Sequence, residues 1–304
     1  MTENGIRGVC AAVLTPLDEH LGPDFTKAIR YYRKLFGAGC TALNLLGTTG
    51  EALSLPTPAR LDFMKAIAGA DLPLTQVMVG TSATALTDTL ELTRTADTLG
   101  FGGALIMPPR PAALLSEDGI VQYYTTIAAA LGNRKRFIYL YNFPRLSGVA
   151  FSEGLIDRIL DKLPAAIAGI KDSSNDLSYE SALAIAHPEL AIFTSSECHL
   201  LAAKRFGLAG CISGTVCLWP ERARSLWYAP DDSNAEIAQR ELCSLRTDVE
   251  KHNLIPAVRF LTSIAENDAS WRRTLPPLTE LADSSRSTLH NLFLQPTGPQ
   301  TAPG

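Results

Sequence analysis

The sequence predicts an α/β fold, a single (β/α)8 TIM barrel followed by a C-terminal helical extension. The 304 residues are 46% hydrophobic and 19% charged, which is typical of a globular protein with a full-sized core. Short runs rich in Val, Ile, Leu and Ala alternate with amphipathic stretches, a pattern typical of parallel strands joined by crossover helices. The alternative is an open doubly wound sheet, but no G-x-G-x-x-G turn follows the first run.

Eight apolar runs are the candidate strands, and they recur every 20 to 35 residues or so, as expected for a closed barrel. In chain order they are Val9–Leu14, Thr41–Leu46, Leu74–Val79, Ala104–Met107, Phe137–Tyr141, Ala166–Ile170, Ala191–Phe193 and Cys211–Ser213. The amphipathic stretches between them predict helices packed outside the sheet. The longest are Phe25–Phe36, Pro58–Ala68, Ala85–Leu99, Glu117–Leu131 and Glu153–Leu163.

The chain has no composition break that would divide it into independent halves. We assign residues 1–218 to the barrel and residues 219–294 to a helical layer of the same domain, because from Trp219 to about Asp268 the pattern is helical without further strands. Residues 295–304 are rich in Pro, Gly, Thr and Gln and are expected to form a disordered tail.

Charge and cysteine content exclude several classes of function. A net charge of -4 gives no electrostatic footprint for nucleic acid, and the basic cluster Arg134–Arg136 is expected to cap a helix or loop. No apolar run approaches eighteen residues and the N-terminus lacks a signal pattern, so we expect no membrane partner and a cytoplasmic protein. The six cysteines form no C-x-x-C pair and are expected to be buried thiols. No metal motif is present, and we expect no metal or other cofactor.

Candidate catalytic residues follow the fifth and sixth runs. In a barrel of this type the active site lies at the carboxyl ends of the strands. Lys171 directly follows the sixth run. At this position a weakly polar mouth of the barrel favours the neutral amine, which is the nucleophile in Schiff-base chemistry. The alternative is a structural lysine paired with Asp172. Tyr141 ends the neighbouring run, where it either relays protons or packs with a hydrated hydroxyl group.

The second run ends in the turn Gly47-Thr48-Thr49-Gly50-Glu51. Its glycines permit a sharp turn, so that two hydroxyl groups and exposed amides face the mouth and form a nest for a carboxylate. In the alternative interpretation this is an ordinary turn, and Glu51 caps the following helix.

Taken together, Gly-Thr-Thr-Gly-Glu, Tyr-Asn-x-Pro at Tyr141–Pro144 and Gly-Ile-Lys-Asp at Gly169–Asp172 resemble the dihydrodipicolinate synthase/N-acetylneuraminate lyase family of class I aldolases. The resemblance extends from about Gly8 to Pro277. It implies that Lys171 forms an iminium with pyruvate or a longer 2-oxo acid, and that Tyr141 transfers the proton.

The resemblance also implies the substrate-binding residues. Thr48 and Thr49 would hold the carboxylate of the 2-oxo acid, Gly47 would let the substrate approach, and Ile212 would offer its carbonyl group. Ser196 and Glu197, after the seventh run, would bind substrate hydroxyl groups. Family members assemble as homotetramers or dimers, so we expect a homo-oligomer.

Departures from the family pattern bear on the substrate. Dihydrodipicolinate synthases carry an arginine two positions after the proline of Tyr-Asn-x-Pro, where this chain has Leu146, although Arg145 is adjacent. Leucine there resembles the sialic acid lyases and the 2-keto-3-deoxy sugar-acid aldolases. After the fourth run the family's Pro-x-Tyr is replaced by Pro108-Pro109-Arg110, and Arg110 is a candidate clamp for a distal anion.

The sequence therefore predicts a pyruvate-releasing class I aldolase acting on a 2-keto-3-deoxy sugar acid or a sialic-acid-like substrate. Three alternatives stay open: a Schiff-base dehydratase of a deoxy sugar acid, a dihydrodipicolinate synthase, and a non-catalytic sensor of 2-oxo acids.

Overall fold

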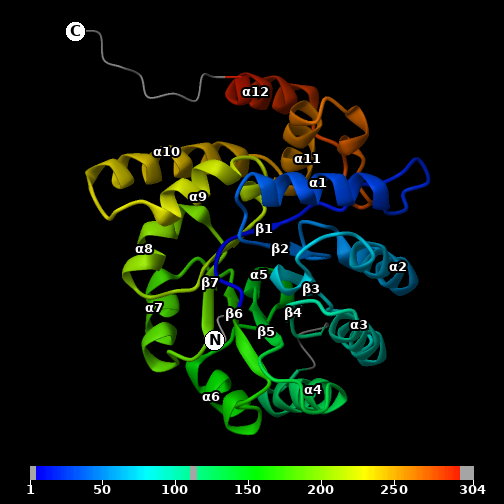
Figure 1. Ribbon diagram of the computed structural model, residues 1–304, viewed down its shortest axis with the longest axis vertical. Helices are drawn as coiled ribbons and strands as arrows, with labels where there is room; N and C mark the ends of the chain where they lie inside the picture. The colour runs from blue at the N-terminus through cyan, green and yellow to red at the C-terminus, as the bar shows by residue number, and fades with distance from the viewer. Residues whose placement is uncertain (1–4, 110–114, 295–304) are drawn as a thin grey trace.

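The computed structural model describes residues 5–109 and 115–294 and shows a closed barrel surrounded by helices (Figure 1). Parallel strands follow one another around the barrel in chain order, and β8 pairs with β1 to close it. The strands are β1 Gly8–Ala12, β2 Ala42–Leu45, β3 Val77–Gly80, β4 Gly103–Ile106, β5 Ile138–Asn142, β6 Ile167–Asp172, β7 Ala191–Thr194 and β8 Gly210–Ser213. The predicted TIM barrel is thus confirmed.

Helices connect successive strands and form the outer layer. The helices between β1 and β8 are α1 Phe25–Gly37, α2 Thr57–Ala68, α3 Leu86–Thr98, α4 Glu117–Ala130, α5 Pro144–Ser147, α6 Glu153–Lys162, α7 Leu177–Ala186 and α8 Leu200–Arg205. Several begin at side-chain caps, for example Asp24 before α1, Ser116 before α4 and Ser152 before α6, each of which accepts a hydrogen bond from a backbone N–H of the first turn.

The C-terminal helices extend the barrel on one side, alongside α1 (Figure 1). They are α9 Pro220–Tyr228, α10 Ser233–Glu250, α11 Leu254–Ala265 and α12 Asp283–Leu294. Helix α11 is buried along most of its length, including its only arginine, Arg259. Within the described residues, no helix has the length and apolar character required to cross a membrane.

Two strand boundaries differ from the sequence prediction in an informative way. The third strand begins at Val77 instead of Leu74, because Leu74–Gln76 form a 3₁₀ turn after Pro73 in which Gln76 N–H donates to Pro73 O at 2.8 Å. The sixth strand continues to Asp172, so Lys171 lies within the strand and pairs with Tyr141 of β5. This extension fixes the backbone of the candidate nucleophile.

Two apolar clusters form the core. One fills the space between the sheet and the outer helices. The other lies inside the barrel and includes Cys10 of β1, Tyr139 and Tyr141 of β5, Phe193 of β7 and Ile212 of β8. Because the interior is filled with side chains, a small molecule that reaches the barrel is expected to bind at the carboxyl ends of the strands.

Candidate active site

Lys171 and Tyr141 lie next to each other at the carboxyl ends of β6 and β5. Lys171 Nζ donates to Tyr141 Oη at 3.3 Å and lies 4.4 Å from the centroid of the tyrosine ring. Both side chains are buried, with exposed fractions of 7% for Lys171 and 5% for Tyr141. No carboxylate of the described residues forms an ion pair with Lys171, so the alternative pairing with Asp172 is absent. The amine can therefore attack a carbonyl carbon without first breaking an ion pair.

Asp172 instead joins β6 to β5. Its Oδ1 accepts a hydrogen bond from Asn142 Nδ2 at 2.5 Å, and its Oδ2 accepts from Ser174 N–H and Ser174 Oγ–H at 3.0 and 2.6 Å. Asn142 and Asp172 each follow one member of the Tyr141–Lys171 pair in the chain. The buried amide–carboxylate contact therefore holds the two catalytic candidates at a fixed separation.

Glu180 of α7 is a second buried carboxyl group, close to Asp172. Its side chain has no solvent exposure, and burial together with the nearby charge of Asp172 raises its pKa to about 8. Burial also raises the pKa of Asp172 above its ordinary value. At neutral pH Glu180 is therefore largely protonated, which avoids two negative charges next to each other in the core.

The raised pKa of Glu180 predicts a pH dependence of stability. The unfolded chain loses this proton near the ordinary pKa of 4.5, whereas the folded protein keeps it up to about pH 8. The free energy of unfolding should therefore fall as pH rises from about 4.5 to about 8, by at most about 1.4 kcal/mol per pH unit from this group, and level off above pH 8. Glu180→Gln should remove this part of the slope in urea unfolding series. The exposed Glu91→Gln of α3 is the matched control, and an equal slope in wild type and Glu180→Gln would contradict the assignment.

The Gly47–Glu51 turn is strained at both ends. Leu46 and Glu51 adopt positive φ angles of 50° and 56°, a region that non-glycine residues adopt rarely. A Cβ atom at Gly47 would lie 2.6 Å from Asn44 Oδ1, so a larger residue here would have to displace the buried Asn44 side chain. Such a backbone persists only where its surroundings hold it.

A buried ion pair between Glu51 and Arg259 stabilises the backbone of this turn. Glu51 Oε1 lies 2.5 Å from Arg259 Nε and Nη2, and Glu51 Oε2 accepts from Leu275 N–H at 2.7 Å. Arg259 also donates to Thr15 O at 2.8 Å. The Glu51 side chain makes no hydrogen bond to the turn that follows it, so its interpretation as a helix cap is wrong. It links the candidate carboxylate-binding turn to helix α11.

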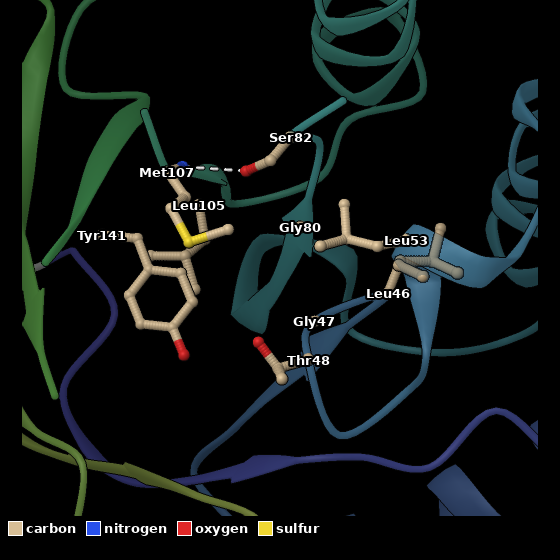
Figure 2. Close-up of a pocket in the computed structure, with 10 residues that line it drawn as sticks. Leu46, Gly47, Thr48, Leu53, Gly80, Ser82, Leu105, Met107 and Tyr141 are labelled. Atoms are coloured by element: carbon tan, nitrogen blue, oxygen red, sulfur yellow. Dashed lines mark hydrogen bonds between the residues drawn. The ribbon is translucent and has the colours of Figure 1, made fainter. Parts of the chain in front are cut away.

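A pocket opens beside this turn (Figure 2). Figure 2 shows the hydroxyl groups of Thr48 and Tyr141 directed into it. Ser82 adds a third hydroxyl group, whose oxygen accepts from Met107 N–H at 2.8 Å. The remaining lining is apolar and is contributed by Leu46, Ala52, Leu53, Leu105 and Met107, with Gly47 and Gly80. A pocket with this mostly apolar lining and three hydroxyl groups suits a small ligand with few polar groups.

The other residues singled out from the sequence have different surroundings. Thr49 is buried and contacts the turn after β8, and Ile212 belongs to the interior cluster that contains Tyr141. Ser196 Oγ accepts from Cys198 N–H at 3.2 Å. Glu197 is fully buried and forms an ion pair with Arg246. It is therefore not free to bind substrate hydroxyl groups, and its prediction as a substrate-binding residue is wrong. Arg110 lies outside the described residues.

The cysteine prediction is wrong for two of the six residues. Cys198 and Cys243 form a disulfide across 45 residues of sequence. The other four, Cys10, Cys40, Cys211 and Cys217, are buried thiols as expected, and burial raises the pKa of each of them. Spacing gave no signal for the bond, because Cys198 and Cys243 meet only through the packing of α10 against the barrel.

Sequence reasoning also missed Asn142, Ser82, Glu180, Arg246 and Arg259. Asn142 and Asp172 carried a signal, because each directly follows a candidate catalytic residue at neighbouring strand ends. Glu180, Arg246 and Arg259 lie on helices, and only the folded chain brings them to the site.

Comparison with known proteins agrees with this geometry. The profile of the dihydrodipicolinate synthetase family matches residues 5–295. An uncharacterized DapA-like lyase of Chloroflexus aurantiacus is 33% identical over 295 residues, which cover 94% of this chain and 96% of the relative.

Solved structures share the fold. Dihydrodipicolinate synthase from Agrobacterium tumefaciens superposes with a TM-score of 0.85 at 26% identity, covering 94% of this chain and 98% of the other. A variant of the 2-keto-3-deoxygluconate aldolase of Sulfolobus solfataricus has a TM-score of 0.83 at 18% identity, with 94% of each chain covered. At this lower identity the similarity concerns the fold alone.

Proposed function

The chain belongs to the dihydrodipicolinate synthetase family, whose members are lyases, and from this premise we propose that it is a pyruvate-releasing class I aldolase with Lys171 as the nucleophile. The observation that carries the proposal is the contact of Lys171 Nζ with Tyr141 Oη at 3.3 Å, both buried at the carboxyl ends of adjacent strands. Nucleophile and proton carrier are then within reach of the same carbonyl group.

The reaction begins when Lys171 Nζ attacks C2 of the 2-oxo acid. Tyr141 protonates the departing hydroxyl group, water leaves, and an iminium remains. Tyr141, deprotonated by that step, accepts the proton of the C4 hydroxyl group; the C3–C4 bond breaks, an aldehyde departs, and the bonding electrons move into the iminium to give an enamine. Protonation at C3 and hydrolysis then release pyruvate and the free lysine.

Thr48 and Thr49 are proposed to hold the carboxylate of the 2-oxo acid. The Thr48 hydroxyl group lines the pocket together with Tyr141, and Thr49 follows it in the same strained turn. A fixed set of donors needs no reorganisation when the substrate binds. The Glu51–Arg259 ion pair is proposed to maintain this geometry.

For the rest of the substrate we propose a 2-keto-3-deoxy sugar acid or a sialic-acid-like molecule. Leu146 packs with Phe143 against the interior cluster, whereas Arg145 is exposed, so the rim of the mouth has no arginine at the position typical of a dihydrodipicolinate synthase.

Product analysis tests this proposal. Incubation with a panel of 2-keto-3-deoxy sugar acids should release pyruvate and an aldehyde in equal amounts. A single product lighter by one water would replace the aldolase with the dehydratase alternative, and binding without any product would replace it with the sensor.

Tyr141→Phe should slow turnover by about 100-fold while iminium formation with pyruvate is partly retained, because the phenol transfers protons but forms no covalent bond. Stopped-flow rates of turnover and of adduct trapping would be compared in the same preparation. Tyr124→Phe, which removes another buried tyrosine hydroxyl group that donates to Ile106 O, controls for packing effects. Unchanged turnover in Tyr141→Phe would limit this residue to a packing role.

A further inference from the structure

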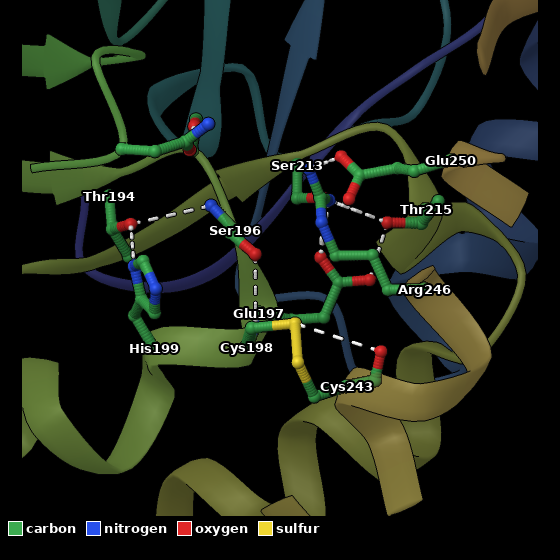
Figure 3. Close-up of polar contacts among 12 residues, drawn as sticks. Thr194, Ser196, Glu197, Cys198, His199, Ser213, Thr215, Cys243, Arg246 and Glu250 are labelled. Carbon is green, nitrogen blue, oxygen red and sulfur yellow. Dashed lines mark hydrogen bonds and ion pairs between the residues drawn. A yellow bond between two sulfur atoms is a disulfide. The ribbon is translucent and has the colours of Figure 1, made fainter. Parts of the chain in front are cut away.

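Helix α10 is attached to the segment that follows β7 along one face (Figure 3). Gln239 Nε2 donates to Glu197 O at 2.9 Å, and Gln239 Oε1 accepts from Leu201 N–H at 3.1 Å. One turn further along, Cys243 is bonded to Cys198. Residues spaced by three or four positions share a face of a helix, so Arg246 continues the same row.

Arg246 makes the central contact of this face. Its Nη1 lies 2.9 Å from Glu197 Oε2 and donates to Ser213 Oγ at 2.6 Å and Thr215 Oγ1 at 2.8 Å, while Nη2 donates to Glu250 Oε1 at 2.6 Å. Ser213 and Thr215 in turn donate to the Glu197 carboxylate. Burial alone would lower the pKa of Arg246, but Glu197 and Glu250 raise it above its ordinary value. The guanidinium of Arg246 and the carboxylate of Glu197 thus both bind the hydroxyl groups of Ser213 and Thr215, on either side of Gly214.

This turn lies directly behind the candidate carboxylate-binding residue Thr49. A Cβ atom at Gly214, between Ser213 and Thr215, would lie 3.0 Å from Thr49 Oγ1 and 3.2 Å from Thr49 Cγ2. Such a close approach means that a displacement of the turn moves Thr49 or opens a gap beside it. The contacts therefore run from Arg246 on α10 to Ser213 and Thr215, and from Gly214 between them to Thr49.

The disulfide lies on the same face of α10 as Gln239 and Arg246. Cys198 and Cys243 are both partly exposed, whereas the four remaining cysteines are buried. A dithiol can therefore reduce this bond selectively: it supplies two electrons and two protons, the S–S bond becomes two thiols, and the dithiol becomes a cyclic disulfide. Disulfides that form in reducing compartments are typically transient and redox-sensing.

We propose that Arg246 is a positioning residue for 2-oxo acid binding and that the Cys198–Cys243 disulfide holds it in place, so that reduction of this bond weakens binding of the substrate carboxylate. The proposal rests on the proposed function insofar as Thr49 binds that carboxylate. Cys243 is one turn of α10 from Arg246. Reduction of the Cys198–Cys243 bond therefore lets α10 shift relative to Glu197 while the Glu197–Arg246 ion pair stays formed.

The first test compares the oxidised protein with the protein treated with dithiothreitol. Pyruvate is trapped on the enzyme with cyanoborohydride, which reduces iminium ions but leaves disulfides intact. The pyruvate concentration for half-maximal trapping should rise about tenfold on reduction, while the limiting rate at saturating pyruvate stays within about twofold. A Cys198→Ser/Cys243→Ser variant should resemble the reduced protein and not respond to dithiothreitol.

Two substitutions of Arg246 separate positioning from folding. Arg246→Met leaves Glu197 buried without a partner and is expected to impair folding, so Arg246→Lys, which keeps the charge, is the informative variant. Arg246→Lys should raise the half-saturating pyruvate concentration without lowering the limiting rate. Lys251→Ala, which removes only the exposed contact with Asp248 at the end of α10, is the matched control and should leave both values unchanged.

Hydrogen exchange gives a readout that does not depend on any activity. Reduction should lower the protection of peptides that contain Ser213–Thr215 and Thr48–Thr49, even if no pyruvate is trapped. Failure of trapping in every state, with the exchange difference present, would overturn the proposed function but retain the positioning role. Equal protection in the oxidised and reduced protein, or equal half-saturation in wild type and Arg246→Lys, would overturn the inference.

Discussion

Lys171→Arg should abolish covalent capture of pyruvate and lower turnover by three orders of magnitude or more. Arginine retains the positive charge at the end of β6, but its guanidinium does not form the iminium, so only binding and electrostatic effects remain. Intact-mass measurement after cyanoborohydride treatment and steady-state release of pyruvate would be recorded on the same sample.

Lys162→Arg is the matched control for this variant, because the residue is exposed at the end of α6 and the substitution is the same. It should behave like wild type. Full turnover in Lys171→Arg would contradict the Schiff-base mechanism, whatever the fate of the other candidate residues.

Arg259→Met should lower the free energy of unfolding by about 3–5 kcal/mol, because it leaves the Glu51 carboxylate buried without its partner. The two side chains have exposed fractions of 0% and 1%. Urea unfolding measures the loss. Since the same carboxylate holds the strained Gly47–Glu51 turn, the half-saturating pyruvate concentration should also rise.

Two further variants make this prediction specific. Adding Glu51→Gln to Arg259→Met removes the uncompensated charge and should restore part of the lost stability. Arg205→Met removes a surface arginine paired with Asp231 and Glu236 and should lower the free energy of unfolding far less, because water screens exposed ion pairs. A loss of similar size in Arg259→Met and Arg205→Met would show that the buried pair is not what stabilises the turn.

The barrel was predictable because its signal is local and repeated. Each strand is an apolar run of the length and composition that a buried parallel strand requires, and the stretches between them are amphipathic with the period of a helix. The proximity of Tyr141 and Lys171 also followed, since strands adjacent in the chain are neighbours in a closed barrel. The interpretation of Lys171 as an ion-paired residue could be rejected only with the structure.

Long-range pairs could not be predicted from one sequence. Glu51 and Arg259 are separated by 208 residues, and nothing near either residue marks its partner. The same holds for Glu197 with Arg246 and for Cys198 with Cys243, which meet through the packing of α10 on the barrel. The sequence suggested a substrate contact for Glu197, because a polar residue after β7 has the same pattern whether it faces the mouth or is bonded inside.

Covalent trapping with pyruvate tests the central claim most directly, because it requires no knowledge of the full substrate. Wild-type protein is treated with pyruvate and cyanoborohydride, and the product is mapped by peptide mass spectrometry. We predict one adduct per chain, on Lys171, which increases the mass of the chain by the mass of pyruvic acid less one oxygen atom. Absence of an adduct at saturating pyruvate, or an adduct on a different lysine, would contradict it.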